Sequence, residues 1–355
     1  MTIRPVRKAV FPVAGLGTRL LPATKSTPKE MLTIVDKPLI QYAVEEARAA
    51  GIEQMIFVTG RGKGALEDHF DVGFELETTM RGRGKSLHAL EAARTGFGEI
   101  VSVRQQQPLG LGHAVWCARH IVGDEPFAVL LPDDLMAGTP GALKQMVDAY
   151  EELGGNIVCA EQVAPERTAS YGIITPGKTD GNRTEVLGLI EKPAPADAPS
   201  RLGVIGRYIL QPEVMAILDA QEPGSGGEIQ LTDAMAKLIG TQAFHAVTVD
   251  AVRHDCGDKL GFVLANLALA LDDAEIGAKV AEAARGLLAR ATADLNSKTG
   301  CTSARLMPNV RYGWKADITD ECPSCRAKTL NSGCRSVGQK FDEILIAQVE
   351  QVCTH

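Results

Sequence analysis

A glycine-containing turn followed by cations, near the start of the chain, has the composition of a phosphate-binding loop. Residues 9–14 are an apolar run that predicts a buried strand, and the turn 15–17 that follows reads Gly-Leu-Gly. Glycines let the backbone approach a phosphate closely, and free N–H groups of such a turn can donate hydrogen bonds to it. Polar and cationic side chains that could contact the phosphates come next: Thr18, Arg19, Lys25 and Lys29. The loop is therefore predicted to bind a nucleoside triphosphate.

Two other glycine loops fit this stretch less well. A dinucleotide-binding G-x-G-x-x-G loop needs a small third residue and a helix, whereas this chain has Leu20 at that position and prolines at 22 and 28. A Walker A loop would need Gly-Lys-Ser/Thr, which does not follow. From the residues alone, an ordinary glycine turn with surface cations remains an open alternative.

Two aspartates that each come after a predicted strand are candidate ligands for Mg²⁺. Asp133 follows the apolar residues 127–131, and Asp255 follows the predicted strand 243–249. Mg²⁺ is characteristically held by one or two carboxylates together with phosphate oxygens. Either aspartate taken singly is more typical of a helix cap or a turn. Their matching positions at strand ends favour the metal interpretation.

A lysine between a glutamate and a proline could bind a sugar phosphate. Lys192 would meet the phosphate, and Glu191 would accept hydrogen bonds from sugar hydroxyl groups. The alternative is a surface ion pair at the start of a proline-rich loop. Gln105 can both donate and accept hydrogen bonds, which suits the edge of a pyrimidine, but it is the first of three consecutive glutamines. Taken one at a time, these residues do not indicate a specific ligand.

Alternating strands and helices must position these residues. This order predicts an α/β fold with a mostly parallel sheet covered on both faces, whose ligands bind at the carboxyl ends of the strands. Gly15 and Asp133 would both lie at that edge. In the first half, strands are predicted at 9–14, 55–59, 100–103 and 127–131, helices at 38–51 and 114–121, and helical pieces in 62–95. Later strands are predicted at 157–163, 172–175, 186–190, 204–210 and 243–249, and helices at 212–220, 228–239 and, as a pair, 259–290.

Bulk composition bounds the class of protein. The 355 residues can bury a large core, and 45% hydrophobic with 23% charged residues is typical of a soluble globular protein. A net charge of −7 argues against nucleic acid as a partner. Residues 1–8 lack the apolar core of a signal peptide, and we find no uninterrupted apolar stretch of membrane-spanning length. We therefore expect no membrane association and a cytoplasmic location.

The ordered set of motifs resembles one family. AGLGTRLLPATKSTPKEML, GLGHA, LPDD, YGII, EKP, VIGRY, GEIQLTD and HDCGDKLGF occur in that order over roughly residues 5–290. Together they resemble the bacterial UTP–glucose-1-phosphate uridylyltransferases, within the wider sugar nucleotidyltransferases. The opening loop alone would indicate only the wider family. GLGHAV, GEIQLTD and HDCG are the motifs that point to the uridylyl branch.

The resemblance implies a Rossmann-like, GT-A-like nucleotidyltransferase fold, with a mostly parallel (mixed) sheet and helices on both faces. It implies transfer of the uridylyl group of UTP to glucose 1-phosphate with Mg²⁺ and a homodimer or homotetramer. The nucleotide would be bound by Ala14, Gly15, Gly17, Thr18, Arg19, Lys29, Gln105 and Gly110, and the sugar phosphate by Gly172, Glu191, Lys192 and Val204. Arg19, Lys29, Asp133 and Lys192 would carry the chemistry, with Asp133 and the less certain Asp255 as metal ligands.

Three rival functions stay open at this point. A thymidylyltransferase acting on the same sugar phosphate is the nearest, because thymine differs from uracil by one methyl group. A catalytically silent sugar-nucleotide-binding regulator is disfavoured, because every charged residue of the motifs is present. An NAD-dependent oxidoreductase is disfavoured by Leu20 and by the missing ribose-binding acid after a second strand.

The last part of the chain does not follow the family pattern. We expect a catalytic domain over residues 1–290, with a nucleotide part at 1–135, a sugar part at 156–255 and helices at 258–290. Residues 291–355 are expected to be a poorly packed, dispensable extension with an amphipathic helix at 341–352. Its cysteines lack the second close pair of a zinc site; they are Cys301, Cys322, Cys325, Cys334 and Cys353.

Overall fold

The computed structural model describes residues 3–299, and the chain divides into two units, Met1–Ala281 and Glu282–His355. Within the described residues, none of the helices has the length and apolar character needed to cross a membrane. The expected domain boundary near residue 290 stays a prediction. The cysteines from Cys301 onward and the expected helix at 341–352 lie outside the described residues.

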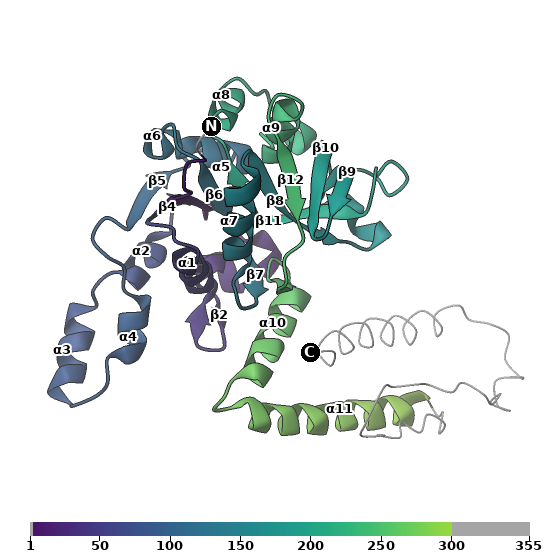
Figure 1. Ribbon diagram of the computed structural model, residues 1–355. Coiled ribbons are helices and arrows are strands. Elements are labelled where there is room, and N and C mark those ends of the chain that lie inside the picture. The colour runs from purple at the N-terminus through teal and green to yellow at the C-terminus, as the bar shows by residue number, and fades with distance from the viewer. Residues whose placement is uncertain (1–2, 300–355) are drawn as a thin grey trace, which may run out of the picture. The chain divides into compact units, whose positions relative to one another are not determined.

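A nine-stranded mixed sheet is the central element of the first unit (Figure 1). Its strands are β1 Lys8–Pro12, β4 Gln54–Thr59, β5 Ile100–Arg104, β6 Phe127–Leu130, β8 Asn156–Gln162, β9 Gly172–Asp180, β10 Arg183–Glu191, β11 Leu202–Leu210 and β12 Phe244–Val247. Their order is β5-β4-β1-β6-β11-β8-β12-β10-β9. The first four are parallel, β11 is antiparallel to both β6 and β8, and β9 and β10 form an antiparallel pair. The expected α/β class with a mixed sheet is confirmed.

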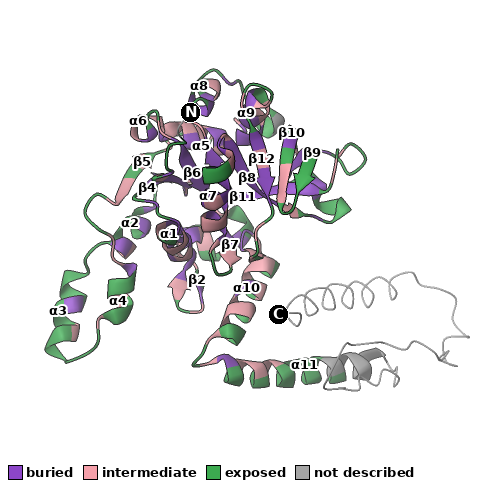
Figure 2. Ribbon diagram, viewed as in Figure 1, coloured by how far each residue is buried: buried purple, intermediate pink, exposed green. Residues whose placement is uncertain are grey.

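Side chains alternate along the strands and fill two cores, one on each face of the sheet. The central strands β6 and β11 are buried along their length (Figure 2). On β1, Val10 contributes to one core, while Ala9 and Phe11 contribute to the other. The core with Phe11 is covered by α1 Leu39–Ala49 and α7 Ala142–Leu153. The core with Val10 is covered by α5 Leu111–Cys117, α8 Val214–Asp219 and α9 Leu231–Leu238. Helices on both faces were expected, although α7 was not predicted.

The remaining helices are shorter or lie toward the end of the described chain. The predicted helix at 114–121 is two helices, α5 and α6 Arg119–Val122, and the charged stretch 62–95 forms three pieces as expected. These pieces are α2 Gly64–Phe70, α3 Phe74–Gly82 and α4 His88–Ala93. The pair predicted at 259–290 is α10 Lys259–Asp272 and α11 Gly277–Thr299. The 3₁₀ turns are η1 Thr18–Leu20, η2 Ala23–Lys25, η3 Lys29–Met31, η4 Pro165–Ser170 and η5 Ser225–Gly227.

Two small sheets lie outside the central one. β2 Thr33–Ile34 pairs with β3 Lys37–Pro38, and β7 Asp134–Ala137 pairs with β13 Val252–Asp255. The strand predicted at 243–249 is β12, which ends at Val247, and Asp255 comes after it as the last residue of an additional strand, β13. Residues 252–255 are mostly polar, so their sequence carries no strand signal, and only pairing with β7 makes them a strand. In that pairing Asp255 lies opposite Asp134.

Candidate active site

The carboxyl ends of the parallel strands bring the predicted nucleotide residues to one edge of the sheet. β5, β4, β1 and β6 are consecutive neighbours, and they lead into Gln105, Gly60, the loop 13–17 and Asp133. A β-carbon added to Gly60 would lie 3.2 Å from the carbonyl oxygen of Ala14, so the β1 and β4 ends are in close contact. Gly17 has φ +67°, a conformation that favours glycine, and it begins the turn η1.

The opening loop and the end of β6 are joined by an ion pair. Lys29 Nζ lies 2.6 Å from Asp133 Oδ2, and both side chains are about four-fifths covered. Burial opposes the charge of Lys29, but the carboxylate of Asp133 outweighs it and raises the lysine pKa above its ordinary value. Burial likewise opposes ionisation of Asp133, and the ammonium of Lys29 holds the pKa of this carboxyl below its ordinary range. Both groups are therefore charged at neutral pH.

Asp255 faces the same space as Asp133. A β-carbon added to Gly257 would lie 3.0 Å from Asp255 Oδ1, 3.3 Å from Asp133 Oδ2 and 3.6 Å from Arg19 Nη1. Two carboxylates and a guanidinium group thus come together against Gly257, where a side chain would crowd them. Within residues 3–299, no three or more His, Cys, Asp or Glu side chains gather in a metal-binding arrangement. Two carboxylates with an open side fit Mg²⁺, which completes its shell with water and substrate phosphate oxygens.

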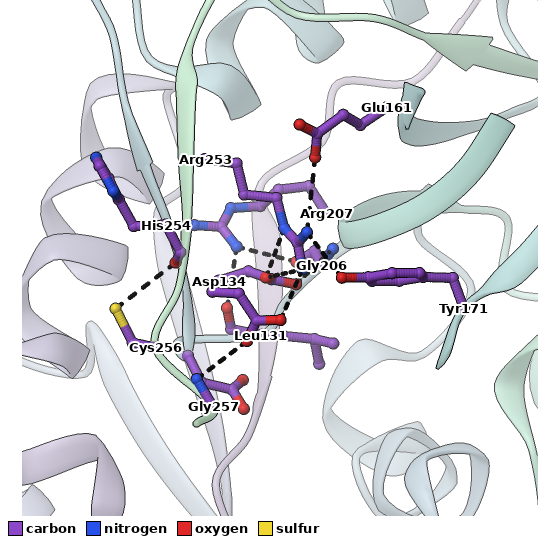
Figure 3. Close-up of polar contacts among 12 residues, drawn as sticks. Leu131, Asp134, Glu161, Tyr171, Gly206, Arg207, Arg253, His254, Cys256 and Gly257 are labelled. Atoms are coloured by element: carbon purple, nitrogen blue, oxygen red, sulfur yellow. Dashed lines mark hydrogen bonds and ion pairs between the residues drawn. The ribbon is translucent and has the colours of Figure 1, made fainter. Parts of the chain in front are cut away.

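Arg253 connects the start of β7 with the other side of the site (Figure 3). Its Nε lies 2.7 Å from Asp134 Oδ1, and its Nη1 lies 3.2 Å from the Tyr171 hydroxyl and 3.6 Å from Glu161 Oε2. Its Nη2 also lies 3.7 Å from Asp255 Oδ2. Only 9% of the arginine side chain is exposed, and the carboxylate of Asp134 raises its pKa although burial opposes the charge. This arginine therefore holds four segments of the chain together next to the two carboxylates.

The predicted sugar-phosphate residues lie at the paired ends of β9 and β10. Glu191 is opposite Gly172 in the antiparallel register, and a β-carbon at Gly172 would lie 3.4 Å from Glu191 Oε2. Lys192 Nζ is 3.0 Å from Glu191 Oε1, and its side chain is 45% exposed, so it is free to approach a ligand. Lys192 has φ +46°, a strained value for a residue with a side chain, and its N–H donates to the carbonyl of Tyr171. The side chain of Val204 is buried in a core, and the preceding residue, Gly203 of β11, pairs with Ile173 of β9.

Directly after β5, at the edge of the sheet where the nucleotide residues lie, Gln105 contacts Gly110. The Nε2 of Gln105 donates to the Gly110 carbonyl at 3.0 Å, whereas residues 106 and 107 are exposed. Gly110 has φ +105°, and a β-carbon there would lie 2.8 Å from the Ile229 carbonyl oxygen. The N–H of Gly112 donates to that same oxygen. The GLGHA loop therefore needs its glycines to pack against residues 228–230 of GEIQLTD.

The sequence reasoning missed several buried polar residues around the site. Glu30 directly follows Lys29 and forms an ion pair with Lys63 at 2.7 Å, with 1% and 7% of the side chains exposed. This pair ties η3 to the start of α2. Burial raises the pKa of Glu30, and its Oε1 has no hydrogen-bond partner among the described residues. Arg253 directly precedes the motif HDCGDKLGF and could have been noticed, whereas nothing in the sequence pairs Glu30 with Lys63.

The fold and this site define a class, the nucleotidyltransferases. The family model described as nucleotidyl transferase matches residues 8–270, and the chain belongs to that family. It is 53% identical over 260 residues to a UTP–glucose-1-phosphate uridylyltransferase of Komagataeibacter xylinus, covering 73% of this chain and 92% of the relative. It is 50% identical over 289 residues to an enzyme of the same name from Bacillus subtilis (strain 168), covering 81% and 98%.

Comparison with solved structures agrees with the comparison of sequences. A UDP-glucose pyrophosphorylase complexed with UDP-glucose is similar with a TM-score of 0.68 and 43% identity, covering 74% of this chain and 98% of that one. A UTP-bound UGPase from Acinetobacter baumannii gives a TM-score of 0.71 at 42% identity, covering 78% and 98%. The resemblance inferred from the motifs is confirmed.

Filling the space at residue 257 should weaken metal binding. In Gly257→Ala the methyl group would stand between Asp133 and Asp255, so we expect the Mg²⁺ concentration for half-maximal rate to rise about tenfold. Thermal unfolding should change little, because neither neighbour is backbone. Gly64→Ala is the matched control, since a β-carbon there meets nothing within 4 Å. An unchanged Mg²⁺ requirement in Gly257→Ala would contradict the placement of the metal.

Proposed function

We propose that this protein transfers the uridylyl group of UTP to glucose 1-phosphate, giving UDP-glucose and pyrophosphate. The observation that carries the proposal is a site with two sides. Arg19, Lys29, Asp133 and Asp255 meet on one side, while Glu191 and Lys192 lie at the ends of β10 and β9. Arg253 links the two through Tyr171. The names of the relatives and of the similar structures support this substrate pair.

The chemistry requires two anions to approach each other. A phosphate oxygen of glucose 1-phosphate attacks the α-phosphorus of UTP in line, a P–O bond forms, and the bond to the pyrophosphate leaving group breaks. The nucleophile is already ionised at neutral pH, so no general base is needed. Lys29 and Arg19 would neutralise and position the triphosphate, and Lys192 would hold the sugar phosphate against it. The raised pKa of Lys29 keeps that group cationic throughout.

Nucleotidyltransferases of this family typically use a divalent metal ion, and we propose Mg²⁺ here. Asp133, with Asp255, would hold it beside the triphosphate. When bound, it would supply charge neutralisation at the phosphate oxygens. The closeness of the two carboxylates at Gly257 and their hard oxygen donors fit this ion. We further propose a cytoplasmic homodimer or homotetramer, as the resemblance implies.

The base is read by Gln105 and Gly110 in this proposal, and Gly172, Glu191 and Val204 would contribute to the glucose site. Gln105 is the half-buried member of the three consecutive glutamines and the one that bonds to Gly110, which supports choosing it. Ala14, Gly15, Gly17 and Thr18 would lie along the nucleotide. A thymidylyltransferase or a silent regulator is not favoured, because the relatives carry the uridylyltransferase name.

Release of pyrophosphate tests the function directly. The purified chain is incubated with UTP, glucose 1-phosphate and Mg²⁺, and pyrophosphate and UDP-glucose are measured together; equal amounts of both are expected. The same assay with dTTP measures the nearest rival, and each substrate alone is the control. Tight UTP binding without pyrophosphate would indicate a silent regulator, and faster reaction with dTTP would indicate a thymidylyltransferase.

A further inference from the structure

Three polar groups beyond the end of β5 form a network, and the proposed function gives a role to Gln105 and Gly110 but none to His113. The Nε2 of Gln105 lies 3.0 Å from the Gly110 carbonyl oxygen and 3.1 Å from Nδ1 of His113, in the first turn of α5. A backbone carbonyl can only accept a hydrogen bond, so the NH₂ group of Gln105 must face Gly110. The Gly110 carbonyl therefore identifies which end of the amide carries the NH₂ group, whatever the tautomer of His113.

The second hydrogen of that NH₂ group needs an acceptor, and His113 provides it. Nδ1 must then be unprotonated, so the neutral ring carries its proton on Nε2. Burial, and after it the positive charge of Arg119, lower the pKa of His113, which favours the neutral ring. The ring is stacked on Trp116, with centroids 5.5 Å apart and planes at 26°. The indole Nε1 donates in turn to Asp219 at 2.9 Å, which holds the stack in place.

We propose that His113, together with the Gly110 carbonyl, orients Gln105 so that only its carbonyl oxygen is offered to the base, and that His113 is thereby a specificity-determining residue. With both amide hydrogens engaged, Oε1 is the polar atom of Gln105 that accepts no hydrogen bond from another described residue. A carbonyl oxygen selects a base edge that carries an N–H donor. Uracil has this donor at N3, whereas N3 of cytosine is an acceptor and would meet Oε1 lone pair to lone pair. The inference rests on the proposed function, in which Gln105 faces uracil.

The oriented Gln105 amide can discriminate between only some bases, and this provides an internal control. Thymine carries the same N3–H as uracil, so the oriented amide discriminates UTP from CTP but not UTP from dTTP. A site that hydrogen-bonds a specific polar group strongly disfavours a ligand that lacks this group. A ligand that differs only by a methyl group is disfavoured much less. His113 acts through Gln105, so it is a positioning residue.

The test compares His113→Phe with wild type and with His69→Phe. Phenylalanine keeps a ring against Trp116 but removes the acceptor at Nδ1. His69 is the matched control, because it is also half-buried and its Nε2 lies 2.9 Å from the side-chain oxygen of Gln41, away from the site. For each protein, kcat/KM is measured with UTP, CTP and dTTP at saturating glucose 1-phosphate, and Kd for UTP and CTP is measured by calorimetry.

We expect the preference for UTP over CTP to fall about tenfold in His113→Phe, in both kcat/KM and Kd, as for the loss of one buried hydrogen bond. The preference for UTP over dTTP should stay within about twofold. His69→Phe should leave both ratios unchanged. His113→Asn, whose amide oxygen can replace Nδ1 as acceptor, should recover most of the UTP preference and gives a second measurement if the phenylalanine variant does not fold.

An equal decrease in kcat/KM with UTP and with CTP in His113→Phe would show a purely structural role for His113 and overturn the proposal. An unchanged UTP:CTP ratio in both His113 variants would do the same. A wild-type chain that neither binds UTP nor releases pyrophosphate would overturn the proposed function and this inference with it. Wild-type activity with an unaltered ratio in the variants overturns the inference alone, so the two failures are distinguishable.

Discussion

Replacing Asp133 by asparagine is expected to lower turnover of UTP and glucose 1-phosphate about 10³-fold while the chain stays folded. Asparagine has the same shape but no charge, so it binds Mg²⁺ weakly and leaves Lys29 without the ion pair at 2.6 Å. The main-chain hydrogen bond from Cys256 to the carbonyl of residue 133 does not depend on the side chain. Rates are measured as a function of Mg²⁺ concentration, and folding is followed by thermal unfolding.

The matched control for this change is Asp180→Asn, in an exposed residue at the end of β9. It makes the same substitution away from the site and should leave the rate unchanged. Near-normal turnover in Asp133→Asn would rule out this carboxylate as a metal ligand. Binding of Mn²⁺ in the presence of UTP, measured without turnover, separates loss of the metal from loss of a later step.

Lys192→Ala is expected to lower kcat/KM for glucose 1-phosphate about 10²- to 10³-fold while KM for UTP changes less than about twofold. The lysine ammonium is an exposed cation at the sugar end of the site, and among the described residues it forms an ion pair with the neighbouring Glu191. The backbone strain at φ +46° is present with either side chain, so the substitution itself adds little strain. Initial rates with each substrate varied in turn give the comparison.

Lys178→Ala removes an exposed lysine from β9 and should affect neither substrate, which makes it the control. If Lys192→Ala weakened use of UTP and of glucose 1-phosphate equally, the lysine would not be specific to the sugar phosphate. A loss of thermal stability matching the loss of activity would instead indicate that the Lys192 N–H to Tyr171 contact had been disturbed.

Most elements could be predicted from local sequence patterns. The apolar run at 127–131 and the periodic residues of 38–51 became β6 and α1, because a buried strand and an amphipathic helix each leave a strong pattern. The polar strand β13 was missed because four residues with one apolar side chain carry no such pattern. The helix predicted at 228–239 begins only at Leu231, since residues 228–230 are needed in extended form against the GLGHA loop.

The sequence by itself determined the family and the α/β class, because ordered glycine and charge motifs require a particular backbone path and a particular ligand chemistry. It also pointed to Lys29 and Asp133, although they are more than a hundred residues apart. Only the tertiary structure decided that these two form an ion pair, that Asp133 and Asp255 come together at Gly257, and that Arg253 joins the two sides. Such contacts depend on strand order and on pairing between distant segments, which local sequence patterns do not specify.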